Sequence, residues 1–107
     1  MSDSALRIDG VPRFWVVFMT TRFLSFAELR RDAPEQLAEH VTTSTQLHER
    51  GELLMAGAFL DHPDEPVRTM GVLNSYDTAR QYAENDPFVK AGLVTDWHIR
   101  EWANIFR

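Results

Sequence analysis

The feature that most constrains the fold is a short β-forming segment that is apolar on both of its faces. Residues 14–19 read FWVVFM, a run of aromatic and β-branched side chains that is typical of a strand. Alternate side chains of a strand point to opposite faces, and both sets here are apolar: Phe14, Val16 and Phe18 against Trp15, Val17 and Met19. A sheet covered on one face alternates apolar and polar residues, so this strand predicts a sheet that is covered on both faces.

The rest of the chain divides into strands and helices at recognisable turn and cap residues. Strand patterns occupy residues 13–20, 52–60, 67–74 and 93–103. One helix is predicted from a cap at Asp32 to Arg50, where Gly51 ends it, and Ser75 caps a second helix over residues 76–84. The resulting order, βαββαβ, is the ferredoxin-like α+β arrangement, in which both helices lie on one face of an antiparallel sheet.

Two stretches around the first predicted helix are unusual. Residues 22–31 form a long connector after the first strand, and Ser25 and Glu28 have the capping-box spacing of a possible helical turn within it. Long ordered connections are often lids or walls of a site. The helix contains the sequence TTST at residues 42–45, which has low helix propensity, so tertiary packing is required to hold it.

Two helices can cover only one face of the predicted sheet, so its second apolar face needs another cover. We expect that cover to be a second copy of the sheet, which gives a homodimer packed sheet face to sheet face. The alternative is that the connector, or the polar lead-in at residues 1–12, folds over this face. A chain of 107 residues suffices for one domain with a real core, so we expect a single domain over residues 1–107.

Charge and composition narrow the classes of partner. A formal net charge of -5 argues against nucleic acids and anionic membranes, because both bind clustered Lys and Arg side chains. No stretch approaches the roughly 20 apolar residues of a membrane span, and residues 1–7 lack the features of a signal peptide. The absence of cysteine excludes disulfides, a thiolate nucleophile and Cys-ligated metals, and it fits a cytoplasmic protein.

A histidine and a distant aspartate are the candidate acid–base residues. His40 shares a helical stripe with Leu37 and Ser44, where a histidine is either a satisfied core residue, the commoner case, or part of a site. Asp86 precedes a proline in the run NDPFVKAGL at residues 85–93, which is ordinary turn chemistry but also fixes a carboxylate at a helix end. If the two side chains meet, the carboxylate can orient the imidazole for proton transfer.

Further candidate residues lie in the connector and along the helix. Aromatic side chains of the connector can wall a pocket for a flat apolar ligand, and its arginines can neutralise an anionic one. Core packing and a solvated basic patch are the corresponding alternatives. The candidate substrate-binding residues are Arg22, Phe23, Phe26, Arg31, Ser44 and Phe88.

The sequence carries no recognised cofactor or metal motif. None of the four histidines has metal-ligand spacing, and no glycine-rich phosphate loop is present. Gly57 and Gly71 are isolated strand glycines, which indicate close approach of another group to the backbone rather than a cofactor site. We therefore expect neither a cofactor nor a metal ion.

Two segments resemble the YCII-related family. Residues 47–57, LHERGELLMAG, which follow His40, resemble the helix-to-strand segment of that family. Residues 85–93, followed by Ile99 and Trp102, resemble its closing signature, and the Asp-Pro-Phe and Ala-Gly-Leu parts are fairly specific. The resemblance extends over most of the chain, from the first strand to the last.

The resemblance implies a dimeric α+β barrel of ferredoxin-like subunits, similar to muconolactone isomerases, with His40 and Asp86 matching the family's pocket residues. One family activity is dehydrochlorination of a chlorinated hydroxyhydroquinone in the degradation of chloroaromatic compounds, which leaves a hydroxybenzoquinone. The expected function is thus cofactor-independent acid–base catalysis on a small cyclic, phenolic or quinone-like substrate. The alternative is a non-catalytic ligand-binding or accessory module. This chain departs from the family in its long connector and threonine-rich helix.

Overall fold

The structure is a computed structural model that describes residues 9–106, so most of the predicted polar lead-in at residues 1–12 lies outside the described residues. Strands and helices follow in the order β1 (Arg13–Thr21), α1 (Phe26–Asp32), α2 (Pro34–Glu49), β2 (Leu53–Ala58), β3 (Arg68–Leu73), α3 (Tyr76–Asn85), α4 (Pro87–Lys90) and β4 (Val94–Ala103). Within residues 9–106, no helix combines the length and the apolar character that crossing a membrane requires.

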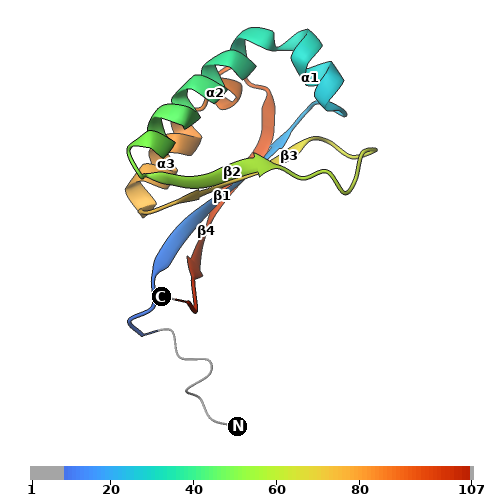
Figure 1. Cartoon of the computed structure of the whole chain (residues 1–107). Helices are drawn as coiled ribbons and strands as arrows, with labels where there is room; N and C mark the ends of the chain where they lie inside the picture. The colour runs from blue at the N-terminus through green and yellow to red at the C-terminus, as the bar shows by residue number, and fades with distance from the viewer. Residues whose placement is uncertain (1–8, 107) are drawn as a thin grey trace.

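The four strands form one antiparallel sheet in the order β2-β3-β1-β4. In the centre of the sheet, Val17 of β1 lies opposite Gly71 of β3 and Ile99 of β4. Helices α1, α2 and α3 lie on the same side of this sheet (Figure 1). The predicted ferredoxin-like α+β fold is confirmed.

The core lies between the helices and the sheet and consists of two clusters of buried side chains. One cluster joins the strands to small residues of α3 and contains Val17, Met19, Leu53, Leu73, Ala79 and Ala83. The other lies under α1 and contains Phe23, Leu29, Ala33, Val67 and Phe88. The alanines at positions 79 and 83 let α3 approach the sheet closely, because they carry only a methyl group.

The connector predicted over residues 22–31 contains the helix α1. Ser25 caps this helix, since its Oγ accepts a hydrogen bond from the Glu28 N–H at 3.0 Å. The Glu28 carboxylate in turn accepts from the Leu24 N–H at 2.9 Å, so the two residues act together at the helix start. Leu29 of α1 is buried in the core between helices and sheet, so the connector does not cover the opposite face of the sheet.

The start of α2 differs from the prediction. Asp32 is the last residue of α1, and its carboxylate pairs with the neighbouring Arg31 at 2.9 Å instead of capping the next helix. Ala33 precedes Pro34 and provides no side-chain cap, because its methyl group has no acceptor; this methyl group is buried in the core. Proline at the first position supplies a preset backbone angle, and its missing N–H removes one donor that would need a partner.

The other helix boundaries agree with the predictions. Gly51 has a φ of +78°, the left-handed conformation that ends α2, and Ser75 caps α3 by accepting from the Thr78 N–H at 3.1 Å. The turn predicted after Asp86 is the single-turn helix α4. This short helix joins α3 to β4 and therefore brings Asp86 beneath α2.

The face of the sheet opposite the helices is apolar at its centre. Cross-strand partners share a face, so the registers group Phe14, Val16 and Phe18 with Met70 and Val72 of β3, and with His98, Arg100 and Trp102 of the edge strand β4. Phe14 packs on Trp102 with ring centroids 6.2 Å apart, and Phe18 stacks on His98 at 5.1 Å. The side chain of Trp102 is nevertheless 51% exposed.

Candidate active site

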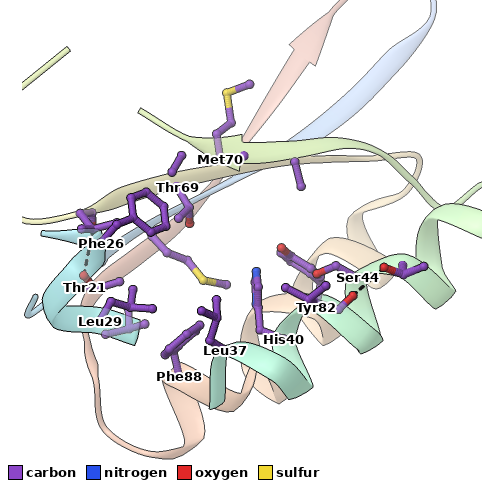
Figure 2. A pocket seen from close by; sticks show the side chains of 18 residues that line it. Thr21, Phe26, Leu29, Leu37, His40, Ser44, Thr69, Met70, Tyr82 and Phe88 are labelled. Atoms are coloured by element: carbon purple, nitrogen blue, oxygen red, sulfur yellow. Dashed lines mark hydrogen bonds between the residues drawn. The ribbon is translucent and has the colours of Figure 1, made fainter. Parts of the chain in front are cut away.

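A cavity of about 270 Å³ lies between α1, α2 and the sheet. Most of its wall is apolar, including Leu29, Leu37 and Phe88. Its polar side chains come from four elements and are Thr21, His40, Ser44, Thr45, Thr69 and Tyr82 (Figure 2). A cavity of roughly 150 Å³ holds benzene, so this one has room for a single substituted ring.

His40 is held in this cavity by a buried carboxylate. Its imidazole points from α2 toward the sheet (Figure 2), and its Nδ1 lies 2.5 Å from Oδ1 of Asp86. The side chain of Asp86 is 1% exposed and that of His40 is 19% exposed. The rings of Phe88 and Tyr82 lie beside the imidazole, with centroids 5.5 and 6.3 Å away. The imidazole therefore has one bonded nitrogen and apolar neighbours on its faces.

Asp86 is itself fixed by the backbone of α4. Its Oδ2 accepts hydrogen bonds from the N–H groups of Phe88 at 3.0 Å and Val89 at 3.3 Å, which makes Asp86 the N-cap of this helix. Pro87 at the first helical position leaves no competing N–H. One carboxylate oxygen thus caps the helix while the other holds His40, so the local sequence Asp-Pro-Phe determines the direction of the imidazole.

The hydrogen bond to Asp86 determines which nitrogen of His40 is available for chemistry. A carboxylate only accepts hydrogen bonds, so Nδ1 of the imidazole must carry the proton that joins the two groups. In the neutral ring, Nε2 then keeps a free lone pair. His40 can therefore accept a proton at Nε2, and the negative charge of Asp86 would stabilise the imidazolium that forms.

Tyr82 of α3 is a cavity residue that the sequence did not single out. Burial raises the pKa of its hydroxyl; a hydrogen-bonding contact with the Ser44 hydroxyl opposes this rise, and the Asp86 charge adds to it. The phenol therefore remains a neutral hydrogen-bond donor at physiological pH. The Oγ of Ser44 is buried and has no hydrogen-bond partner in acceptable geometry among the described residues.

Gly71 makes room for Tyr82. A Cβ atom at position 71 would lie 3.2 Å from Cε2 of the Tyr82 ring, closer than an ordinary van der Waals contact. The close approach predicted for Gly71 is therefore confirmed. The same prediction is wrong for Gly57, where a Cβ would meet only open space.

Three of the six predicted substrate-binding residues line the cavity, namely Phe26, Ser44 and Phe88. Phe23 does not, because its side chain is buried in the core under α1. The two phenylalanines of the connector differ because Phe26 lies at the start of α1 and faces the cavity, whereas Phe23 lies before this helix and enters the core.

The two predicted arginines also lie outside the cavity. The Arg22 guanidinium lies over the outer side of the Phe23 ring, 5.8 Å from its centroid, and Arg31 pairs with Asp32 on the exposed side of α1. Neither is among the residues that line the cavity, and no other Lys or Arg of residues 9–106 lines it. The wall thus offers hydrogen bonds and apolar contact rather than a fixed positive charge.

Sequence patterns did not predict the other polar residues that line the cavity. Thr21 and Thr69 are ordinary strand residues, and the hydroxyl of Thr21 is already occupied by the Val67 carbonyl at 3.0 Å. No sequence pattern distinguished Tyr82 from the other aromatic residues, and only the strand glycine Gly71, which packs against it, indicated a special position. Among residues 9–106, no three His, Asp or Glu side chains are arranged to hold a metal ion.

Comparison with solved structures gives the same fold. The chain is similar to 5-chloro-2-hydroxyhydroquinone dehydrochlorinase (TftG) from Burkholderia phenoliruptrix AC1100, solved with 2,5-dihydroxybenzoquinone, with 19% identity and a TM-score of 0.62 over 85% of this chain and 94% of that one. It is also similar to a dimeric ferredoxin-like protein from an uncultured marine organism, with 12% identity and a TM-score of 0.53 over 96% of each chain. No curated protein sequence matches the chain significantly.

The sequence itself assigns the family. The YCII-related domain matches residues 14–103, which extend from the start of β1 to the end of β4 and include both His40 and Asp86. This match confirms the resemblance that residues 47–57 and 85–93 suggested. The chain belongs to the YCII-related family.

Proposed function

We propose that this protein is a cofactor-independent enzyme in which His40 and Asp86 move a proton on a small cyclic or phenolic substrate. The observation that supports this proposal best is the bond between His40 Nδ1 and a buried, helix-capping carboxylate beside an apolar cavity. That arrangement leaves Nε2 as a base for a ligand in the cavity. An imidazole transfers protons near neutral pH without any cofactor.

The cavity favours a flat, uncharged ring as the substrate. Its volume of about 270 Å³ suits one substituted ring, and the part of the chain that the structure describes contributes no Lys or Arg to its lining. The dehydrochlorinase with a similar fold was solved with a dihydroxybenzoquinone, a ring of this kind. We therefore propose a chlorinated hydroxyhydroquinone as the substrate and elimination of HCl as the reaction.

The elimination needs only proton transfers and a leaving group. His40 Nε2 takes a proton from a ring hydroxyl and returns it to the chlorine-bearing carbon, which gives the ketone tautomer. The base then takes a second hydroxyl proton, and the electron pair left behind forms a carbonyl and expels chloride from that carbon. One H⁺ and one Cl⁻ leave, and a hydroxybenzoquinone remains without any external oxidant.

Chloride release tests this proposal. A panel of chlorinated hydroxyhydroquinones is incubated without oxygen, and chloride and quinone absorbance are followed for the wild type, His40→Gln and His48→Gln. His48 lies on the same helix, and its Nδ1 contacts the Leu53 carbonyl at 2.7 Å, so it is a matched control. Loss of His40 should reduce turnover by about 10²- to 10⁴-fold, as for other positioned acid–base groups.

Two outcomes would overturn the enzymatic proposal. Equal turnover by His40→Gln and the wild type would remove His40 from the chemistry. Binding of the ring compounds without release of chloride or any other product would favour the alternative, a non-catalytic ligand-binding module of the same fold.

We further propose that the protein works as a homodimer joined through the bare face of its sheet. The apolar side chains of that face are not covered by the described helices, and Trp102 is half exposed there. An exposed apolar face of this kind marks an interaction surface. One solved protein of similar fold is dimeric.

Sedimentation of point variants tests this assembly. Trp102→Glu should shift the protein to monomers, because it introduces a charge into the apolar face. Leu24→Glu changes a residue of similar exposure at the start of the connector and should leave the dimer intact. A monomeric wild type, or a Trp102→Glu variant that stays dimeric, would refute the proposed interface.

A further inference from the structure

We propose that Tyr82, supported by Ser44, binds a second oxygen atom of the substrate while His40 acts on the first. This inference rests on the proposed function and requires that the substrate carry at least two oxygen substituents, as a hydroxyhydroquinone does. It assigns Tyr82 a specificity role that neither the family signature nor the sequence patterns indicated.

The position of Tyr82 is determined on both sides of its ring. The side chain extends from α3 and lines the same cavity as His40, with the two ring centroids 6.3 Å apart. Its edge lies against the backbone of β3, where any side chain at Gly71 would approach to 3.2 Å. A tyrosine ring packed in this way has a fixed position in the wall of the cavity that His40 also lines.

Ser44 supplies the second observation that points to a ligand. It lies one helical turn after His40 on the same face of α2 and lines the same cavity as His40 and Tyr82 (Figure 2). Its Oγ is buried near the Tyr82 hydroxyl, whose pKa it lowers, but it makes no well-formed hydrogen bond with any residue among 9–106. A buried hydroxyl without a partner costs free energy, and a ligand oxygen would satisfy it.

The chemistry of a neutral phenol matches what the second oxygen needs. Burial raises the pKa of the Tyr82 hydroxyl, so the group stays protonated and uncharged. It can therefore donate a hydrogen bond to a neutral ring. The second oxygen of such a ring, whether a hydroxyl or the carbonyl of a ketone tautomer, has a lone pair that accepts this hydrogen bond. The bond holds the ring in one orientation, so that the first oxygen faces His40.

Binding of simple phenols separates this role from a structural one. The dissociation constants of phenol, catechol, resorcinol and hydroquinone are measured without oxygen for the wild type, Tyr82→Phe and Tyr76→Phe. Tyr76 is the chain's other tyrosine, is exposed at the start of the same helix and serves as the control. The comparison removes one hydroxyl from the ligand and one from the protein, so it reports the coupling between them.

The expected result is a preference of about 3- to 10-fold for at least one dihydroxybenzene over phenol, the ratio that one hydrogen bond gives. Tyr82→Phe should bind that compound and phenol equally well, Tyr76→Phe should keep the preference, and Ser44→Ala should lose part of it. A wild type that shows no preference or binds none of the four compounds, or a Tyr82→Phe variant that keeps the preference, would overturn the inference. Because the assay measures binding alone, a protein that shows the coupling but releases no chloride would refute the proposed reaction and leave the oxygen site standing.

Discussion

Replacing Asp86 by asparagine should abolish the base while leaving the fold nearly intact. The amide oxygen of asparagine can still accept the N–H groups of Phe88 and Val89, which Asp86 Oδ2 accepts at 3.0 and 3.3 Å. Asparagine and aspartate are equally good N-caps. The amide nitrogen would face His40 Nδ1, however, and it can only donate. The imidazole must then move its proton to Nε2, which removes the lone pair from the cavity.

The magnitude follows from a comparison with Asp86→Ala. Alanine removes the cap and thereby leaves the buried Phe88 N–H without an acceptor, at a cost of about 1–3 kcal/mol. We therefore expect Asp86→Ala to lower the free energy of unfolding by about 1–3 kcal/mol and Asp86→Asn by clearly less, under about 1 kcal/mol. Both variants should lose turnover, by about 10²- to 10⁴-fold.

Two measurements check this reasoning. Urea unfolding gives the stability difference between the variants, and long-range ¹H–¹⁵N correlation spectra report the tautomer of His40. The wild type should carry the proton on Nδ1 and Asp86→Asn on Nε2. An Nε2–H tautomer in the wild type, or equal stability losses in the two variants, would show that the carboxylate does not have the double role described.

Three further substitutions give simple expectations. Gly71→Ala places a methyl group 3.2 Å from the Tyr82 ring and should lower the free energy of unfolding by about 1–2 kcal/mol in urea; an unchanged midpoint would mean that the ring yields freely. Ser25→Ala removes the cap of α1 and should cost about 1 kcal/mol in the same experiment, with no loss pointing to a cap made by Glu28 alone. Arg31→Ala should leave phenol binding unchanged in a fluorescence titration, because Arg31 pairs with Asp32 outside the cavity; weaker binding would return it to the site.

The fold was predictable because the signals that begin and end its strands and helices lie within a few residues of each boundary. The strand patterns, the cap at Ser75 and the glycine at position 51 each act within a few residues, and their order admits the ferredoxin-like arrangement. The start of α2 was predicted wrongly for the opposite reason. Ala33 occupies the cap position because its methyl group fits the core, and this packing is not visible in the sequence around Asp32.

The candidate site was predictable only in part. His40 and Asp86 are 46 residues apart, so their contact depends on how α4 returns beneath α2, and the family resemblance rather than spacing suggested it. The arginines of the connector were expected near a ligand, but Arg22 lies over the Phe23 ring before α1 begins, and Arg31 pairs with Asp32 on the exposed side of α1. Tyr82 was missed because an aromatic residue on an amphipathic helix is indistinguishable from a core residue until the space beside Gly71 is known.

The central claim is that His40, held by Asp86, acts on an oxygen of a ring bound in the cavity between the helices and the sheet. A crystal structure of the protein soaked with 2,5-dihydroxybenzoquinone tests it most directly. The account predicts the ring inside the cavity, with one oxygen about 2.6–3.2 Å from His40 Nε2 and another within reach of the Tyr82 hydroxyl. A ring bound elsewhere, a cavity left empty at saturating ligand, or a ring whose oxygens all avoid Nε2 would contradict it.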